Sequence, residues 1–384
     1  MSFRRLLVLV GPRSYRKQQE IALFQNLPHF ETFFLFADES GSCKGGCRHV
    51  HTCSGLQVDK ILPDSVSSLV TRQPYSPVSF IRLRNLEKCF EARDVVNCIE
   101  IYSFISKQCV EIARRRRVKS IVSVFETISS SPVHRVWPFS ENARVVKREA
   151  SVFMAYSERS AMCLRGLSIP EDKIYIVYPG VDLRQFHPSP RIDDDLVRVL
   201  MVSGLAGRKG LPLALEAFSR LESTISKRHH VELSLCGKIR TVEDHAMIQR
   251  YSRKYRIRAL GELPHGQMPT VYAQSDILLH PSVDHRILGT KVWEEQYGFA
   301  LVEAMASGLP IVSTDCGTNR EIIGPENFLV RQGSDEALAM GLRALIEDEA
   351  TRRKLGEANR VRCEKLFDLN KQRAKVDEVL YRVL

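Results

Sequence analysis

The stretch that decides the fold is residues 294–312, Glu294-Glu295-Gln296-Tyr297-Gly298-Phe299-Ala300-Leu301-Val302-Glu303-Ala304-Met305-Ala306-Ser307-Gly308-Leu309-Pro310-Ile311-Val312. Residues 300–307 are rich in good helix formers, and Gly308 followed by Pro310 predicts the end of that helix. Residues 309–313 are apolar and partly β-branched, which predicts a buried strand. A loop, a helix and a buried strand in this order are typical of an α/β sheet.

The start of this helix is a candidate phosphate site. The loop containing Gly298 leaves backbone N–H groups near Phe299 and Ala300 without helical partners, and such a helix end carries about half a positive charge. Glu295 precedes the helix and Glu303 lies about one turn inside it. Carboxylates accept hydrogen bonds from hydroxyl groups and do not bind phosphate. A phosphate site between two such acids predicts a sugar nucleotide; the alternative is an ordinary helix whose acids face solvent.

The same residues resemble a known family. Glu295 and Glu303, separated by seven residues that include Gly298 and followed by residues 304–310, resemble the donor-site motif of glycosyltransferase family 4, the glycosyl transferases group 1. The resemblance implies a retaining enzyme of the GT-B fold. In that α/β fold, two Rossmann-like parallel-sheet domains face each other across a cleft.

Length and composition favour an ordinary two-domain globular protein. The chain has 384 residues, of which 44% are hydrophobic and 26% charged. No apolar run approaches the roughly 20 residues that span a bilayer, and residues 6–10 predict a first strand rather than a signal peptide. We therefore expect a cytoplasmic protein whose ten cysteines stay mostly reduced.

The positive charge is concentrated in the first half. Residues 1–187 contain 27 Lys and Arg against 18 Asp and Glu, and so carry +9 of the net charge of +11. This balance suits a phosphate-bearing acceptor or peripheral contact with an anionic membrane at its inner face. Nucleic acid is disfavoured as a partner, because no binding motif accompanies the charge.

Strand and helix patterns divide the chain into two α/β domains and a tail. We expect an N-terminal Rossmann-like acceptor-binding domain at 1–187, a C-terminal Rossmann-like donor-binding domain at 188–369, and a helix at 370–384 that crosses back to the first domain. The predicted strands are residues 5–10, 32–36, 118–125, 152–156, 197–202, 231–235, 277–280 and 309–313. Residues 83–117 read as helical and polar.

Three candidates lie on the acceptor side. In open α/β sheets ligands lie beyond the carboxyl ends of the strands, so Gly11 and Glu126, which each follow a predicted strand, should face the cleft. The resemblance implies an acidic or histidine residue near the acceptor, which makes Glu126 a candidate catalytic residue and His134 a second candidate. The alternatives are a simple strand-ending turn and solvated loop residues.

A cluster of cysteines and histidines follows the predicted strand at residues 32–36. Its spacing matches no common zinc finger, so we favour a surface loop over a metal site. The cluster consists of Cys43, Cys47, His49, His51 and Cys53.

Residues 203–210 predict the diphosphate loop of the donor domain. Small residues such as Gly204 allow close backbone approach, and Lys209 supplies a cation. The resemblance implies an arginine directly after the first glycine, but Leu205 stands there, and Arg208 is a displaced second cation. Leu263 is a candidate contact for the nucleotide base. The family resemblance does not predict the shape of the sugar pocket, because this chain has an insertion at residues 283–293.

The expected reaction is transfer of a hexose-type sugar from a UDP- or GDP-sugar to a glycan or lipid-linked saccharide, as in envelope or exopolysaccharide synthesis. By resemblance, Glu303 accepts from ribose hydroxyls and Glu295 from sugar hydroxyls, while Lys209 and Arg208, with the amides of Phe299 and Ala300, stabilise the departing diphosphate. No metal, cofactor or enzyme nucleophile is required. The alternatives are a GT-B sugar-nucleotide epimerase and a non-enzymatic scaffold or membrane-binding module. A dehydrogenase is disfavoured because the full dinucleotide glycine pattern is absent from the sequence.

Overall fold

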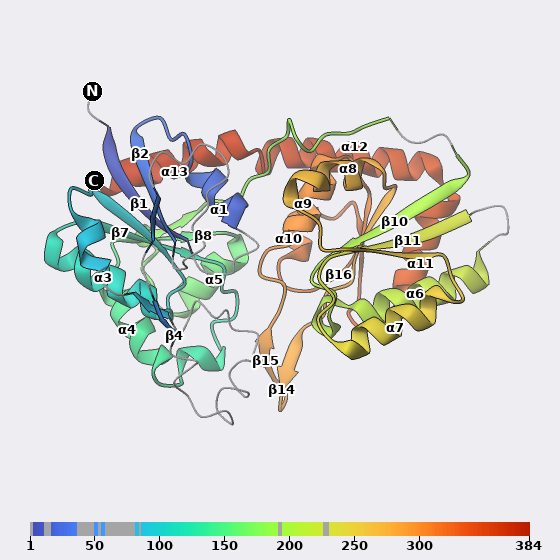
Figure 1. The fold of residues 1–384 in the computed structure, drawn as a ribbon, viewed down its shortest axis with the longest axis horizontal. Coiled ribbons are helices and arrows are strands. Elements are labelled where there is room, and N and C mark those ends of the chain that lie inside the picture. The colour runs from blue at the N-terminus through green and yellow to red at the C-terminus, as the bar shows by residue number, and fades with distance from the viewer. Residues whose placement is uncertain are drawn as a thin grey trace. The chain divides into compact units, whose positions relative to one another are not determined.

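The computed structural model describes residues 3–10, 17–36, 50–52, 55–57, 81–83, 86–190, 194–225 and 230–384. The chain divides into two compact units (Figure 1). The first unit comprises Met1–Gly180, Leu288–Trp293 and Leu369–Leu384, and the second comprises Val181–Ile287 and Glu294–Asp368. The division falls after Gly180, whereas the sequence places the boundary at His187.

The first unit is built on a seven-stranded sheet in the order β3-β2-β1-β6-β7-β8-β9, in which every neighbouring pair is parallel. A separate antiparallel pair joins β4 to β5. The strands are β1 Arg4–Val10, β2 Phe30–Phe36, β3 Val50–Thr52, β4 Gly55–Gln57, β5 Ile81–Leu83, β6 Val95–Ile99, β7 Lys119–Val124, β8 Val152–Ala155 and β9 Ile174–Ile176.

Helices lie on both faces of this sheet, as the doubly wound fold requires. The helix α3 packs against α4, and α1 packs against α13, on opposite sides of the strands in Figure 1. The helices of this unit include α1 Lys17–Phe24, α3 Phe104–Arg116, α4 Phe139–Glu149, α5 Glu158–Gly166 and α13 Leu369–Val383.

The prediction that residues 83–117 are helical throughout is wrong. This stretch contains a 3-10 turn at Leu86–Phe90, the central strand β6, and then α3. Ala92 and Glu100, which both have positive φ angles, lie in the turns before and after this strand. Asn97 makes the segment look polar, but its side chain is buried in the sheet and accepts a hydrogen bond from Ser123 Oγ at 2.8 Å. A buried, hydrogen-bonded polar residue is compatible with a central strand.

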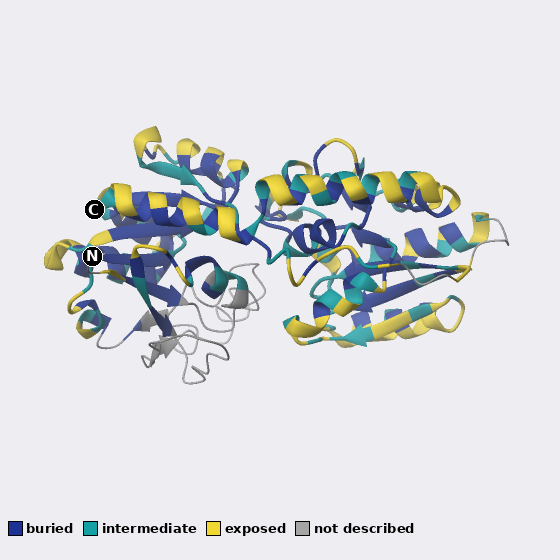
Figure 2. Cartoon of the chain, turned by 90° about the horizontal axis from the view of Figure 1, so that it is seen from above, coloured by how far each residue is buried: buried dark blue, intermediate teal, exposed yellow. Residues whose placement is uncertain are grey.

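The last helix belongs to the first unit. Its buried face includes Val376 and Leu380, and Figure 2 shows exposed and buried residues alternating along it. Tyr178 N–H donates to Gln372 Oε1 at 3.0 Å, and His29 N–H donates to a carboxylate oxygen of Asp377 at 3.1 Å. The first unit therefore includes residues from both ends of the chain.

The second unit has a six-stranded parallel sheet in the order β12-β11-β10-β13-β16-β17. The strands are β10 Leu196–Val202, β11 His230–Cys236, β12 Ile257–Gly261, β13 Ile277–His280, β16 Ile311–Thr314 and β17 Phe328–Val330. The order reverses between β10 and β13, and ligands of such sheets bind beyond the carboxyl ends of the strands at that point.

The helices of the second unit also cover both faces of its sheet, with α6, α7 and α11 on one side and α9 and α12 on the other (Figure 1). They are α6 Leu211–Thr224, α7 Val242–Ser252, α8 Met268–Ala273, α9 Phe299–Ala306, α10 Asn319–Ile323, α11 Asp335–Glu347 and α12 Glu349–Leu366. Strands β10, β11 and β13 supply the core between these layers, which includes the fully buried Leu233, Phe218 and Leu342.

The insertion at residues 283–293 forms a short hairpin. Strand β14 His285–Ile287 pairs with β15 Thr290–Trp293. The two residues at its tip, Leu288 and Gly289, both have positive φ angles, of 48° and 78°. Two such residues in a row are the pattern of a type I′ hairpin turn.

Candidate active site

The predicted donor residues gather at the switch point of the second sheet. Lys209 follows β10 in a 3-10 turn at Gly207–Lys209, Ser282 follows β13, and Glu295 precedes α9. Because the carboxyl ends of neighbouring parallel strands meet at one edge of a sheet, these loops converge there.

A glycine locks the Lys209 loop onto the loop after β13. Gly210 has a φ of +79°, and a Cβ at this position would lie 1.9 Å from Pro281 O. One residue before Lys209, Arg208 O accepts a hydrogen bond from Val283 N–H at 2.9 Å. The backbone on both sides of Lys209 is thus held against residues 281–283. This fixes the backbone position from which the Lys209 side chain extends.

Glu295 is a buried carboxylate at the centre of the site, with only 2% of the residue exposed. Its Oε2 lies 2.6 Å from Lys209 Nζ, accepts from Ser282 Oγ at 2.8 Å, and lies 3.4 Å from His280 Nε2. Burial alone would raise the pKa of Glu295, but the charge of Lys209 and the contact with His280 together hold that pKa well below its usual value. These three contacts all meet the same carboxylate oxygen, Oε2.

The loop after β16 fixes the backbone of Glu295. Thr318 N–H donates to Glu295 O at 2.9 Å, and Cys316 Sγ accepts from Glu295 N–H at 3.4 Å. Gly317, between them, has a φ of +55°, and a Cβ there would lie 2.0 Å from Glu295 O. This close approach requires glycine at position 317.

Glu303 is the second acid and points to a different set of donors. The residue is buried on α9, its Oε1 lies 2.9 Å from His265 Nε2, and its Oε2 accepts from the Tyr272 hydroxyl at 2.9 Å. The hydrogen bond to Glu303 raises the pKa of His265 despite partial burial. Burial and the nearby carboxylate raise the pKa of Tyr272 well above its usual value.

The helix start between the two acids has the expected form. Helix α9 begins at Phe299, and a Cβ at Gly298 would lie 2.7 Å from Leu301 Cδ1. One detail differs from the expectation: Phe299 N–H already donates to Tyr297 O at 3.1 Å. Ala300, in the first turn, is the clearer candidate for an amide that meets a phosphate.

The remaining donor candidates are placed less centrally. Leu205, which stands where the resemblance implies an arginine, is fully buried in the core. Arg208 is exposed, and Leu263 is half-buried just after β12. The guanidinium of Arg240 lies against the loop after β10, and its Nη2 would lie 3.2 Å from a Cβ at Gly204.

The acceptor-side candidates belong to the first unit. Glu126 is buried, and its Oε1 accepts from the backbone N–H groups of Thr127 and Ile128, so this carboxylate organises its own loop. Burial and, next, the charge of Lys147 lower the pKa of His134 to about 4. Gly11 lies outside the described residues, as does the cysteine and histidine cluster apart from the backbone of His51 in β3.

Sequence reasoning missed four residues of the site: His280 and Ser282 beside Glu295, and His265 and Tyr272 beside Glu303. In the sequence, Ser282 shows only that a strand leads into the donor loop. His265 and Tyr272 are seven residues apart, a spacing that puts both on one face of a helical segment. That spacing was the available signal, but it did not indicate that both residues would contact Glu303.

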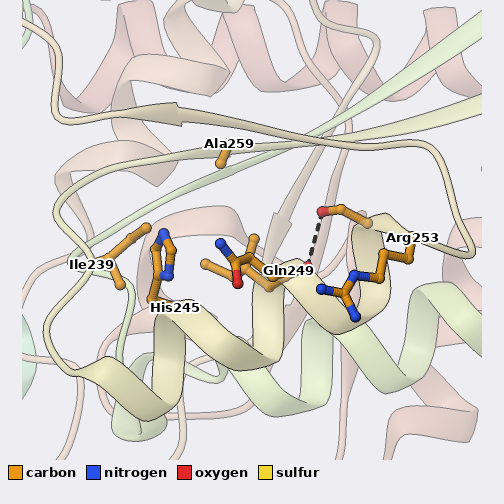
Figure 3. A pocket seen from close by; sticks show the side chains of 7 residues that line it. Ile239, His245, Gln249, Arg253 and Ala259 are labelled. Atoms are coloured by element: carbon orange, nitrogen blue, oxygen red, sulfur yellow. Dashed lines mark hydrogen bonds between the residues drawn. The ribbon is translucent and has the colours of Figure 1, made fainter.

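Two cavities of the second unit are lined by neither of these acids. One, of about 390 Å³, lies between α7 and β12 (Figure 3). His245 and Gln249 line it from successive turns of α7, and Ala259 lines it from β12. A second, also of about 390 Å³, is lined by Asp315, Arg320 and residues 329–332.

Residues 182–362, which make up most of the second unit, match the family model for glycosyl transferases group 1. This part of the chain belongs to that family. The match agrees with the resemblance of the two-acid motif, and the group 1 domain contains Lys209, Glu295 and Glu303.

Curated relatives of the group 1 domain are distant. The chain is 27% identical over 226 residues to WcaL of Salmonella typhimurium, a protein named for colanic acid biosynthesis, covering 58% of this chain and 54% of WcaL. It is 25% identical over 241 residues to the MMP alpha-(1->4)-mannosyltransferase of Mycolicibacterium hassiacum, covering 61% of this chain and 55% of that protein. The chain thus spans about half the length of these relatives.

Solved structures extend the likeness to the whole fold. Anabaena Alr3699/HepE in complex with UDP superposes with a TM-score of 0.73 at 16% identity, covering 99% of this chain and 100% of that one. A glycosyltransferase from Rickettsia africae also gives 0.73 at 16% identity, covering 100% and 99%. The predicted GT-B fold, with two Rossmann-like parallel-sheet units, is confirmed. Within the described residues, no helix is both long and apolar enough to cross a bilayer.

Proposed function

We propose that this protein is a retaining glycosyltransferase that moves a hexose-type sugar from a UDP- or GDP-sugar to a glycan or lipid-linked saccharide. The observation that carries the proposal is the position of Lys209 and two buried acids around the start of α9 at the sheet's switch point. A cation and a helix end suit a diphosphate, and two carboxylates suit the hydroxyls on either side of it.

In the proposed reaction each group has a separate task. Glu303 accepts hydrogen bonds from the ribose, and Glu295 accepts through Oε1 from the sugar. The bond from the anomeric carbon to the diphosphate breaks, and the bond to the acceptor oxygen forms on the same face. The acceptor proton passes to the departing diphosphate, whose negative charge Lys209 and the start of α9 stabilise. No metal or enzyme nucleophile takes part.

The pairing of Lys209 with Glu295 has a mechanistic consequence. The carboxylate, 2.6 Å away, holds the lysine ammonium in place. The diphosphate then meets a cation already positioned, so little reorganisation is needed as charge develops in the transition state. Ser282 and His280 keep the carboxylate oriented while Lys209 is shared with the phosphate.

The acceptor class and the cellular location are proposed from the names of two relatives and from the charge of the first 187 residues. WcaL is named for colanic acid biosynthesis, and the mycobacterial relative is named for transfer of mannose. The first 187 residues carry most of the positive charge. We propose an acceptor of the envelope-glycan or lipid-linked class, used by a cytoplasmic protein in peripheral contact with an anionic membrane.

The proposal is tested by screening UDP- and GDP-sugars for thermal stabilisation, then measuring sugar transfer and donor hydrolysis. We expect Lys209→Ala to lower the rate at least about 100-fold, because it removes a cation from the leaving group. We expect Glu303→Ala to raise the donor KM. Lys254→Ala and Glu357→Ala, at exposed positions of the same unit, are the matched controls.

Two results would contradict this function. Near-normal activity of both site variants would remove their assigned roles. A donor incubated without acceptor that yields an epimerised sugar nucleotide would indicate an epimerase instead.

A further inference from the structure

The loops that follow β10 and β11 run side by side at the carboxyl edge of the second sheet. Ser203 N–H donates to Cys236 O at 3.0 Å, and Leu205 N–H donates to Lys238 O at 2.9 Å. Gly237 has a φ of +140°, and a Cβ at this position would lie 1.7 Å from Ser203 O. Backbone contacts therefore fix the start of the second loop against the first.

Arg240 comes next in the second loop, and its guanidinium lies against Gly204 of the first. A Cβ at Gly204 would lie 3.2 Å from Nη2, 3.3 Å from Nε and 3.7 Å from Cζ of Arg240. The first two distances are shorter than ordinary van der Waals contact, so a side chain at position 204 would push the guanidinium away. Glycine at this position allows the arginine to lie on the loop.

The guanidinium of Arg240 is placed to meet a ligand. The residue is exposed, and within the part of the chain that the structure describes no carboxylate forms an ion pair with it. Its planar set of N–H donors suits the paired oxygens of a phosphate, which arginine binds through two parallel hydrogen bonds. Ligands of parallel sheets bind beyond the carboxyl ends of the strands, and Arg240 lies in a loop at that edge.

The groups already assigned to the site leave little positive charge for a diphosphate. Lys209 lies 2.6 Å from Glu295, which neutralises it. Glu303 is a second buried carboxylate, and a protonated His265, 2.9 Å away, neutralises no more than that one charge. The start of α9 adds about half a positive charge. A diphosphate carries several negative charges, so a further cation is needed to stabilise it beside two acids.

We propose that Arg240 binds the diphosphate of the sugar nucleotide, and that Gly204 is required to hold its guanidinium at the donor site. The inference rests on the proposed function, because it places the diphosphate at the carboxyl edge of β10. Leu205, the residue directly after Gly204, is fully buried and carries no charge. The loop after β11 thus supplies a cation that the loop after β10 lacks at this point.

The experiment measures the Kd of UDP and GDP by calorimetry at several NaCl concentrations for the wild type, Arg240→Ala and Arg240→Lys. We expect Arg240→Ala to weaken nucleotide binding about 10-fold or more, because it removes charge-assisted hydrogen bonds. Its Kd should also depend less on salt than that of the wild type, since one cation fewer attracts the diphosphate. Arg240→Lys keeps the charge without the planar donors, so it should recover part of the affinity and the salt dependence.

Two controls separate a contact with phosphate from a general loss of structure. Uridine and guanosine, which carry no phosphate, should bind the wild type and Arg240→Ala equally, as measured by ligand-observed NMR. Arg258→Ala removes an exposed arginine from the edge strand β12 and should leave every Kd within about two-fold of the wild type. Thermal unfolding of each variant verifies that it is folded.

A second arm tests the role of Gly204. Gly204→Ala should weaken nucleotide binding a few-fold, because the methyl group shifts the guanidinium. A variant that combines it with Arg240→Ala should bind no more weakly than Arg240→Ala alone. Gly266→Ala is the matched control, since Gly266 is exposed and a Cβ there would meet no atom within 4 Å. Fully additive losses from Gly204→Ala and Arg240→Ala would overturn the role of the glycine.

The outcomes separate the two proposals. A wild type that binds neither UDP nor GDP overturns the proposed function and this inference with it. A wild type that binds, with an Arg240→Ala variant of equal affinity and salt dependence, overturns this inference alone. An Arg240→Ala variant that binds the nucleoside and the nucleotide more weakly by the same factor also overturns it, because the arginine would then not act on the phosphates.

Discussion

At the scale of single residues, Glu295 combines two properties that normally oppose one another. Its side chain is buried, and its pKa is held well below the usual value, so that the carboxylate is ionised. Burial disfavours a carboxylate, and the Lys209 charge 2.6 Å away more than offsets it. Because Lys209, Ser282 and His280 all meet Oε2, the charge is held through one oxygen. In the proposed reaction, Oε1 is the oxygen that accepts from the sugar.

The pKa of Glu295 makes a prediction about stability. A carboxyl group whose pKa is lower in the folded state stabilises the fold above its unfolded pKa, near 4.5, and that stabilisation is lost as pH falls. We expect the free energy of unfolding of the wild type, relative to Glu295→Gln, to fall by about 1.4 kcal/mol per pH unit below about pH 4.5. Urea unfolding at pH 7, 5, 4 and 3 measures the difference. Parallel curves for the two proteins would show that Glu295 is not held ionised.

At the scale of elements, the site depends on loops whose backbones approach each other closely. Gly210 lies against Pro281, and Gly317 lies against Glu295, each at a distance that a Cβ would not allow. These contacts join the loops after β10, β13 and β16 into one support. The side chains of the site are therefore positioned by backbone packing as much as by their own hydrogen bonds.

Gly317→Ala tests this support, and the chain contains a matched control. Gly317 and Gly333 both have positive φ angles, but a Cβ at Gly333 would meet no atom within 4 Å. Gly333→Ala should cost about 1–2 kcal/mol of unfolding free energy, from the backbone conformation alone. Gly317→Ala should cost clearly more and lower donor affinity, because the added methyl group displaces Glu295. Equal losses in the two variants, measured by urea unfolding, would mean that the close approach is unimportant.

The hairpin tip offers an opposite test, in which stability should rise. Leu288 is fully exposed with a φ of +48°, a conformation that suits asparagine or glycine. Leu288→Asn creates the Asn-Gly pair that type I′ turns favour. We expect about 1 kcal/mol of stabilisation, measured as a higher urea midpoint with an unchanged slope. Leu288→Ala, which keeps the unfavourable backbone, should give little gain.

The sequence predicted those elements whose local pattern agrees with their place in the fold. The helix of residues 300–307 and the strand after it are examples, since their propensity, end signals and burial all agree. Strand β6 was missed because five residues carry no period that separates a buried strand from a helix. Lys209, Glu295 and Glu303 could be named from the motif. His280 and His265 could not, because only the folded sheet brings them to those acids.

At the scale of the whole molecule, the site and the last helix belong to different units. Lys209, Glu295 and Glu303 lie in the second unit, whereas α13 belongs to the first. Because we propose that the first unit binds the acceptor, a lesion in α13 should damage sugar transfer while leaving nucleotide binding intact. This separation follows from the division of the chain, in which each unit has its own buried core.

Val376→Asp tests that separation. Val376 is fully buried on α13, and an unpaired carboxylate there should unfold the first unit, because burying an isolated charge is strongly unfavourable. We expect loss of transfer, an early unfolding transition and rapid proteolysis of the first unit, with the Kd for the bound nucleotide within a few-fold of the wild type. Lys375→Asp, at the exposed neighbouring position, should leave all four measurements unchanged. If Val376→Asp abolished nucleotide binding as well, the two units would unfold as one, and the donor site would depend on both.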